Sequence, residues 1–341
     1  MTASYWGGGE KEMYELAMGL KRLGHEVEVY ALPYTLENRR KVDRSLIYNE
    51  EIPYHEGIIR PIKADICYVM YHPFAWLNFP TTAPRIASFH SQIWFGPDRK
   101  GYGVVSRAAA LLNDHLLQRE LARYDAVHVH YDATAREIER RAPQHPRIHT
   151  IEHFIDTDVF RPNGGRVNDK FQVLYVGRPV WQKGFDLFVR LAHDLADERS
   201  QFSFVGGETP DERITSYGLV KDPKSLAKIL GDAHIVVSPQ RIEKTVVGRS
   251  VLEALSCGTP VVLMTKPIDP PLGDCESLFT TENYGSLRST VREFYRTWRS
   301  GGYDEARLSS QARRCIVQNY SLESTIRRYE SMFEDVIRNR S

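Results

Sequence analysis

The chain has 341 residues, enough for two domains of ordinary size, and 42% of them are hydrophobic. Its 45 lysines and arginines nearly balance 44 aspartates and glutamates, so we expect no nucleic-acid partner, which would need a strongly positive surface. Runs of eighteen apolar residues and signal-peptide patterns are absent, and the four cysteines lack metal-like spacing. We therefore expect a reduced, cytoplasmic protein.

The N-terminal half alternates between strand-like and helical patterns. A glycine loop at 7–9 leads into a helical pattern that ends at Gly24. No apolar strand precedes the loop, so we expect either that the first strand is missing or that the numbered start is late. Further strands are predicted at 27–31, 65–71, 85–89 and 126–130, and helices at 101–124 and 133–141.

The second half repeats this alternation, and its last forty residues are helical. Strands are predicted at 171–176, 202–205, 234–237 and 261–264, with helices between them. Alternation of this kind is typical of an α/β fold, here two doubly wound parallel-sheet domains. We place an N-terminal domain at 1–163, a C-terminal domain at 164–318 and a terminal helix at 319–341.

Two cations follow the predicted strand at 171–176. Gly177 ends that strand, and Arg178 and Lys183 flank the turn into the next helix. In an open α/β sheet, ligands bind at this edge. A guanidinium and an ammonium suit a diphosphate, although two solvated loop cations are the simpler alternative.

A single carboxylate, Glu253, lies on an otherwise apolar helical stretch. The helix stops at Gly258, Pro260 forbids its continuation, and an apolar strand follows. A carboxylate in such surroundings is paired or meets a ligand, unless it is simply solvated. Gly248 and Arg249 open this helix, where the N–H groups favour a phosphate.

Together these segments resemble the retaining GT-B glycosyltransferases of family 4, also described as glycosyl transferases group 1. The resemblance implies two Rossmann-like domains facing a cleft, with a C-terminal helix that crosses back to the first domain. It also implies transfer of a sugar, with retention of configuration, from a nucleotide-diphosphate-sugar donor. The acceptor would be a glycan, a lipid-linked molecule or a natural product, and polysaccharide biosynthesis is one setting for this reaction.

The resemblance assigns roles to individual residues. The implied catalytic residues are Arg178, Lys183, His90 and Glu243. The implied nucleotide-binding residues are Gly8, Gly9, Gly177, Thr245, Gly248, Arg249 and Glu253. The family spaces two glutamates as Glu-x7-Glu, but Thr245 stands eight residues before Glu253 and Glu243 stands ten before it. Either residue can fill the first position.

We expect no metal and no cofactor, since the nucleotide sugar is a substrate. Asp156 and Asp158 imitate an Asp-x-Asp metal site, but their context favours a turn. His128 and His130 are two positions apart and His149 and His153 are four apart, but no cysteine or carboxylate cluster completes a zinc set. We therefore interpret these as core or surface histidines.

The expected partners are a nucleotide-sugar donor and a glycan or lipid-linked acceptor. A peripheral contact with the inner face of a membrane is compatible with the aromatic and basic stretch at 94–107. Two other functions stay open. One is a nucleotide-sugar 2-epimerase, which would bind the same donor, and the other is an inactive nucleotide-sugar-binding protein.

Overall fold

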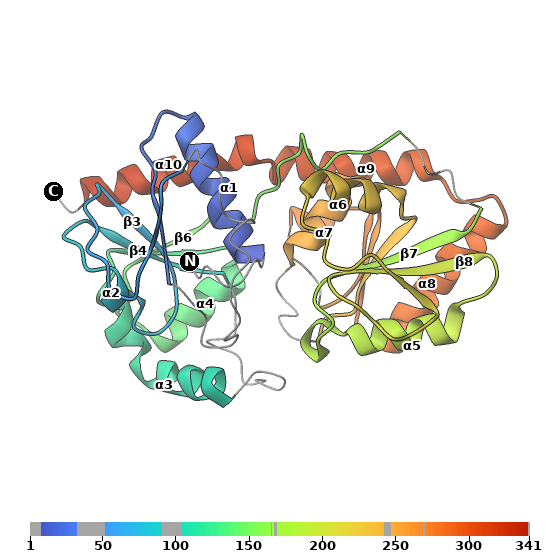
Figure 1. The fold of residues 1–341 in the computed structure, drawn as a ribbon, viewed down its shortest axis with the longest axis horizontal. Helices are drawn as coiled ribbons and strands as arrows, with labels where there is room; N and C mark the ends of the chain where they lie inside the picture. Colours follow the sequence, from blue (N-terminus) through green and yellow to red (C-terminus); the bar gives the residue numbers. More distant parts are fainter. Residues whose placement is uncertain are drawn as a thin grey trace. The chain divides into compact units, whose positions relative to one another are not determined.

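The computed structural model describes residues 8–32, 52–90, 104–164, 166, 169–241, 247–266, 268 and 270–339 (Figure 1). The chain forms two compact units. Unit 1 comprises Met1–His153 together with Glu323–Ser341, and unit 2 comprises Phe154–Leu322. The end of the chain therefore returns to the unit in which the chain began.

Unit 1 is built on a parallel sheet with the strand order β3-β4-β5-β6. A separate parallel pair is formed by β1 and β2. Its elements are α1 (Gly8–Arg22), β1 (Val29–Ala31), β2 (Tyr54–Glu56), β3 (Cys67–Met70), α2 (Ala75–Asn78), β4 (Arg85–Phe89), α3 (Val104–Leu121), β5 (Ala126–Val129), α4 (Asp132–Arg141) and β6 (Arg147–Thr150).

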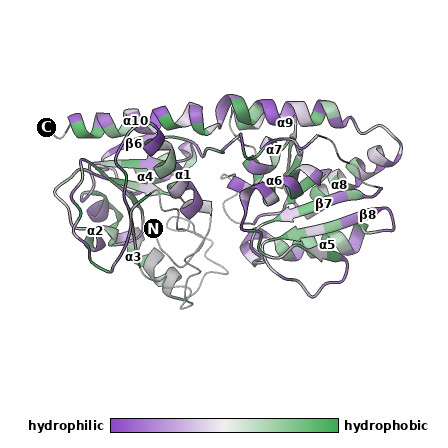
Figure 2. Cartoon of the chain, turned by 45° about the horizontal axis from the view of Figure 1, so that its top comes forward, coloured by the Kyte–Doolittle hydropathy of each residue, from purple (hydrophilic) through white to green (hydrophobic). Residues whose placement is uncertain are grey.

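The terminal helix α10 (Leu322–Arg338) packs on unit 1. Its buried residues include Tyr329 and Phe333, whose rings meet Tyr68 of β3 at centroid distances of 6.0 and 5.6 Å. Polar contacts at the rim include one between His25 Nε2 and Glu330 Oε1 at 2.9 Å. Figure 2 shows the apolar and polar residues alternating along α10. The return of this helix to the first domain was predicted and is confirmed.

Unit 2 is a six-stranded parallel sheet with the order β12-β11-β10-β7-β8-β9. In chain order this is the doubly wound 3-2-1-4-5-6 arrangement, so the predicted fold class is confirmed. Its elements are β7 (Phe171–Val176), the 3-10 turn η3 (Trp181–Lys183), α5 (Phe185–Leu195), β8 (Ser200–Val205), β9 (Ile214–Ser216), α6 (Pro223–Asp232), β10 (Ile235–Ser238), α7 (Arg249–Ser256), β11 (Val261–Met264), η4 (Leu272–Asp274), β12 (Leu278–Thr281), α8 (Tyr284–Arg299) and α9 (Glu305–Asn319).

Helices cover both faces of this sheet, α5 and α8 on one side and α6 and α7 on the other (Figure 1). Side chains of successive strand residues point to opposite faces, so β7 serves two cores. Tyr175 packs with α5 and α8, whereas Leu174 packs with α6 and α7. Burial on both faces explains why this strand is apolar from Val173 to Val176.

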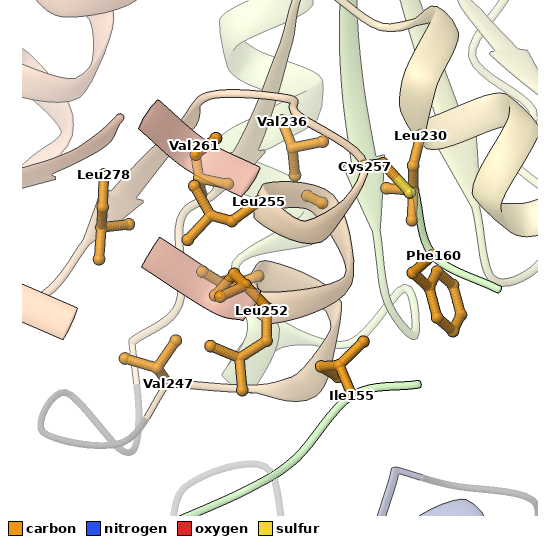
Figure 3. Packing of buried hydrophobic residues seen from close by; sticks show 14 of the residues in the cluster. Ile155, Phe160, Leu230, Val236, Val247, Leu252, Leu255, Cys257, Val261 and Leu278 are labelled. Atoms are coloured by element: carbon orange, nitrogen blue, oxygen red, sulfur yellow. The ribbon is translucent and has the colours of Figure 1, made fainter. Parts of the chain in front are cut away.

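Helix α7 is nearly enclosed by its neighbours. Leu252 and Leu255 belong to one buried cluster with Val236 and Val261 from the sheet. Figure 3 shows Phe160, from the preceding segment, in the same cluster beside Leu230 and Cys257. Burying two leucines stabilises the unit by about 3–6 kcal/mol in transfer free energy. This packing fixes the position of the helix and therefore of its N-terminus.

The Asp156–Asp158 segment forms a turn, as predicted. Asp156 Oδ1 accepts hydrogen bonds from the backbone N–H groups of Asp158 and Val159, each at 3.1 Å. This is the side-chain-to-backbone bonding by which aspartate stabilises turns. Arg313 donates to the Thr157 carbonyl at 2.8 Å and so ties the turn to α9.

Candidate functional site

The strand order of unit 2 reverses between β7 and β10. These two strands are neighbours, and the chain leaves β7 toward β8 on one side and β10 toward β11 on the other. Connections that diverge in this way leave an opening at the carboxyl ends of the two strands. The predicted phosphate-binding residues follow these strands.

The loop after β7 is held by a buried tyrosine. Tyr175 Oη donates to the backbone carbonyl of Arg178 at 2.9 Å and lies 3.4 Å from the carbonyl of Lys183. Burial raises the pKa of Tyr175 above its ordinary value, so the phenol keeps the proton that it donates. The two predicted cations, Arg178 and Lys183, thus lie on a loop whose two ends are both held by the Tyr175 hydroxyl.

Gly184 closes this loop in a conformation and a space that suit only glycine. Its φ angle is 70°, and an added Cβ would lie 1.9 Å from the carbonyl oxygen of Pro239. The segment after β10 therefore lies directly against the loop after β7. A glycine is required wherever two backbones approach this closely.

Arg241 clamps the same loop from the β10 side. Its guanidinium donates to both carboxylate oxygens of Asp186, each at 2.5 Å, and to the Trp181 carbonyl at 2.8 Å. The guanidinium also lies 4.9 Å from the centroid of the Trp181 ring. The bidentate contact holds the pKa of Asp186 below its ordinary value. Sequence reasoning missed this clamp because its partners are 55 positions apart.

A small recess of about 50 Å³ lies at the switch point. It is lined by Tyr175, Val176, Gly177, Lys183, Ser238, Gln240, Gly248 and Ser250. Helix α7 begins at its wall, and in the part of the chain that the structure describes no side chain caps its N-terminus. An ammonium, two hydroxyls and a helix N-terminus around one recess make a site for an anion.

Of the predicted site residues, the catalytic candidate Lys183 and the nucleotide-binding candidates Gly177 and Gly248 line this recess. Arg178 is exposed at the start of the loop. Arg249, the first residue of α7, and Glu253, one turn later, are both buried, with 3.6 Å between Arg249 Nη2 and Glu253 Oε1. Glu243 and Thr245 lie outside the described residues.

In unit 1, the predicted residues Gly8, Gly9 and His90 come together. Helix α1 starts at Gly8, and a Cβ on Gly9 would lie 3.2 Å from Met70 and 3.5 Å from His90. The absence of a side chain at Gly9 therefore lets the start of α1 lie against the histidine that follows β4.

A buried carboxylate accompanies the histidines of unit 1. Glu12 of α1 is 1% exposed, and its Oε2 lies 2.6 Å from His153 Nδ1 and 3.7 Å from His90 Nδ1. Its Oε1 lies 3.7 Å from His130 Nδ1. The sequence-based inference that no carboxylate joins these histidines was wrong, because the fold brings Glu12 to His153 across 141 positions.

This cluster sets the charge of Glu12. Burial alone would raise the pKa of the carboxyl, but the histidine rings around it, with His153 Nδ1 at 2.6 Å, hold that pKa well below its ordinary value. Glu12, His130 and His153 are also the one group in the described residues whose three possible metal-ligand atoms lie within 4.8 Å of one another. Hydrogen bonds already engage this group: Nδ1 of His153 faces Glu12, and Nδ1 of His130 faces the Ile151 carbonyl at 3.1 Å.

Two family descriptions match the chain. Residues 6–159 match "Glycosyltransferase Family 4" and residues 170–295 match "Glycosyl transferases group 1". Among the curated relatives, a human phosphatidylinositol N-acetylglucosaminyltransferase subunit is 22% identical over 75% of this chain and 58% of its own. The D-inositol 3-phosphate glycosyltransferase 1 of Catenulispora acidiphila is 30% identical over 34% of this chain and 35% of its own. The chain thus spans less than two thirds of the length of these relatives.

Solved structures share the fold. Anabaena HepE, solved with UDP and glucose, has a TM-score of 0.72 at 12% identity and covers 98% of both chains. Sucrose-phosphate synthase from Thermosynechococcus elongatus has a TM-score of 0.71 at 15% identity, over 95% of this chain and 92% of that one. Among the described helices none is long and apolar enough to cross a membrane. With two family descriptions matching in tandem and this fold, the chain belongs to the glycosyl transferases group 1, of GT-B architecture.

Proposed function

We propose that this chain transfers a sugar from a nucleoside-diphosphate sugar to an acceptor hydroxyl, with retention of configuration and without a metal ion. The observation that carries the proposal is the recess at the β7/β10 switch point, where Lys183 and the N-terminus of α7 meet. The recess is small, so we assign to it a phosphate of the donor rather than the whole nucleotide.

The chemistry requires positive charge at this position. Breaking the bond between sugar and phosphate places negative charge on the departing diphosphate and oxocarbenium character on the sugar. Fixed cations and dipoles stabilise such charge when they are held in place before the reaction. Lys183 and α7 meet this condition, because Tyr175 and Arg241 hold the loop and apolar packing holds the helix. Arg178 stands on the same loop, and we assign it to the diphosphate as well.

Retention is proposed to proceed by attack of the acceptor on the face that the diphosphate leaves. No Asp or Glu occurs among the described residues that line the recess, so these residues offer no carboxylate nucleophile. We assign Glu253 to the nucleotide ribose and His90 to a sugar hydroxyl, in keeping with the family resemblance.

The relatives suggest which substrates to test first. HepE was solved with UDP and glucose, and the two relatives are named for phosphatidylinositol and for D-inositol 3-phosphate. We therefore propose UDP-sugars as the first donors and inositol-bearing molecules as the first acceptors, with glycan and other lipid-linked acceptors next. A lipid acceptor would bring the enzyme to a membrane surface.

The test has two stages. Nucleoside diphosphates are first screened by thermal shift, because a ligand that binds the native state raises the melting temperature. Donors carrying the preferred base are then incubated with each acceptor, and the anomeric configuration of the product is determined by NMR.

Transfer that inverts the configuration would overturn the proposed retention. Epimerisation of the donor sugar with no acceptor present would indicate an epimerase. Binding without turnover on the whole acceptor panel would indicate a binding protein.

A further inference from the structure

One backbone carbonyl in unit 1 accepts hydrogen bonds from two histidine rings. The Ile151 oxygen lies 3.0 Å from His128 Nε2 and 3.1 Å from His130 Nδ1. A carbonyl oxygen only accepts, so both nitrogens must carry hydrogen. The contact therefore fixes where each of the two rings holds a proton.

The first ring, His128, has its other nitrogen engaged as an acceptor. Its Nδ1 lies 2.7 Å from Tyr68 Oη and 3.0 Å from Ser88 Oγ, and both hydroxyls can donate. Burial lowers the pKa of His128 to about 3, so the ring carries a single proton, at Nε2. Each nitrogen of the His128 ring therefore has a partner that matches its protonation.

The second ring, His130, is also neutral. Burial holds its pKa well below the ordinary value, because the ring is enclosed and desolvation disfavours the charged form. Its one proton lies at Nδ1, on the bond to Ile151, which leaves Nε2 with a lone pair. That lone pair faces His90 Nδ1 at 3.2 Å.

Two ring nitrogens that both lack hydrogen cannot form a hydrogen bond. His90 Nδ1 must therefore carry the hydrogen and donate it to His130 Nε2. When His90 carries this proton and no other, its Nε2 is an acceptor. This atom is buried and has no hydrogen-bond partner among the residues that the structure describes. A buried acceptor without a partner is costly and therefore points to a ligand that supplies a donor.

Resting on the function proposed above, we propose that His130, held by the Ile151 carbonyl, fixes His90 as its Nδ1–H tautomer, so that His90 Nε2 accepts a hydrogen bond from a substrate hydroxyl. His130 is then a positioning residue for His90. The Glu12 carboxylate, 3.7 Å from His90 Nδ1, favours the same orientation because it attracts this N–H. In water the Nε2–H tautomer of histidine predominates, so the proposal specifies the less common form.

The direct test is nitrogen NMR of the protein labelled with 15N-histidine, without substrate. The His90 signals are assigned by their loss in His90→Gln. The expected result is a protonated Nδ1 and an unprotonated Nε2 at neutral pH. A His90 ring that carries a proton at Nε2, whether alone or together with Nδ1, would overturn the proposal.

Two substitutions at His130 separate positioning from packing. Asparagine places its amide near the Nδ1 position and removes the acceptor for His90, whereas the glutamine oxygen reaches the Nε2 position. His130→Gln should keep the His90 tautomer and His130→Asn should lose it. His115→Asn, at an exposed position of α3, is the matched control. If His130→Asn leaves the His90 signals unchanged, the proposal fails.

The expected effect on activity is that of losing one hydrogen bond, the one between His90 Nε2 and the substrate hydroxyl. Its loss lowers kcat/KM about two- to tenfold in His130→Asn, with recovery in His130→Gln. The NMR result does not depend on turnover, so a protein that shows the Nδ1–H tautomer but transfers no sugar would refute the proposed function alone. A stoichiometric metal ion bound to Glu12, His130 and His153 would overturn the tautomer, because a ligating nitrogen cannot carry that proton.

Discussion

Gly184→Ala tests whether the loop after β7 must pack against the segment after β10. The substitution imposes two costs. A left-handed φ costs a non-glycine residue about 1–2 kcal/mol. The new Cβ would also stand 1.9 Å from the Pro239 oxygen, which is backbone and cannot rotate away, and such overpacking costs about 1–3 kcal/mol more.

Gly301→Ala is the matched control, because Gly301 lies in the same unit with φ 75° and has no atom within 4 Å of an added Cβ. We expect the control to lose about 1–2 kcal/mol of unfolding free energy and Gly184→Ala about 2–5 kcal/mol. Urea denaturation measures both. In a calorimetric titration with the preferred nucleoside diphosphate, Gly184→Ala should weaken binding and Gly301→Ala should not, because only the first displaces Lys183. Equal destabilisation and equal affinity in the two variants would refute the reasoning.

Three further predictions concern the charges. Lys183→Ala should lower kcat/KM about 10²–10³-fold, whereas Lys224→Ala, at an exposed position of α6, should leave it unchanged. Burial lowers the pKa of His234 to about 4, so unfolding takes up a proton below the ordinary His value and stability should fall as pH drops from about 6.5 to 4. His234→Asn, which retains an acceptor for the Gln172 N–H, should flatten this slope in urea titrations by at most about 1.4 kcal/mol per pH unit. Transfer should persist in excess chelator, and a loss that manganese restores would contradict the metal-free proposal.

The sequence was informative where physical constraints are local. The strand predicted at 171–176 coincides with β7, because a strand buried on both faces consists mostly of apolar residues and so leaves a local pattern. The edge strand β9 escaped prediction, since only one of its three residues is buried and it leaves little pattern. For the same reason β2, with no fully buried residue, was not foreseen.

The candidate site likewise contains residues that the sequence predicted and contacts that it did not. Lys183 and Gly248 follow directly from a strand end and a helix start, and both line the recess. Contacts between distant segments were not readable from the sequence, because local patterns carry no information about them. The Arg241–Asp186 clamp and the pairing of Glu12 with His153 are of this kind.

The most direct measurement of the central claim is a crystal structure of the chain with a nucleoside diphosphate bound. We predict that a phosphate occupies the recess at the β7/β10 switch point, within hydrogen-bond distance of Lys183 Nζ and of the first backbone N–H groups of α7. A diphosphate bound elsewhere, with the recess around Gly177 and Ser250 left to water, would contradict the account.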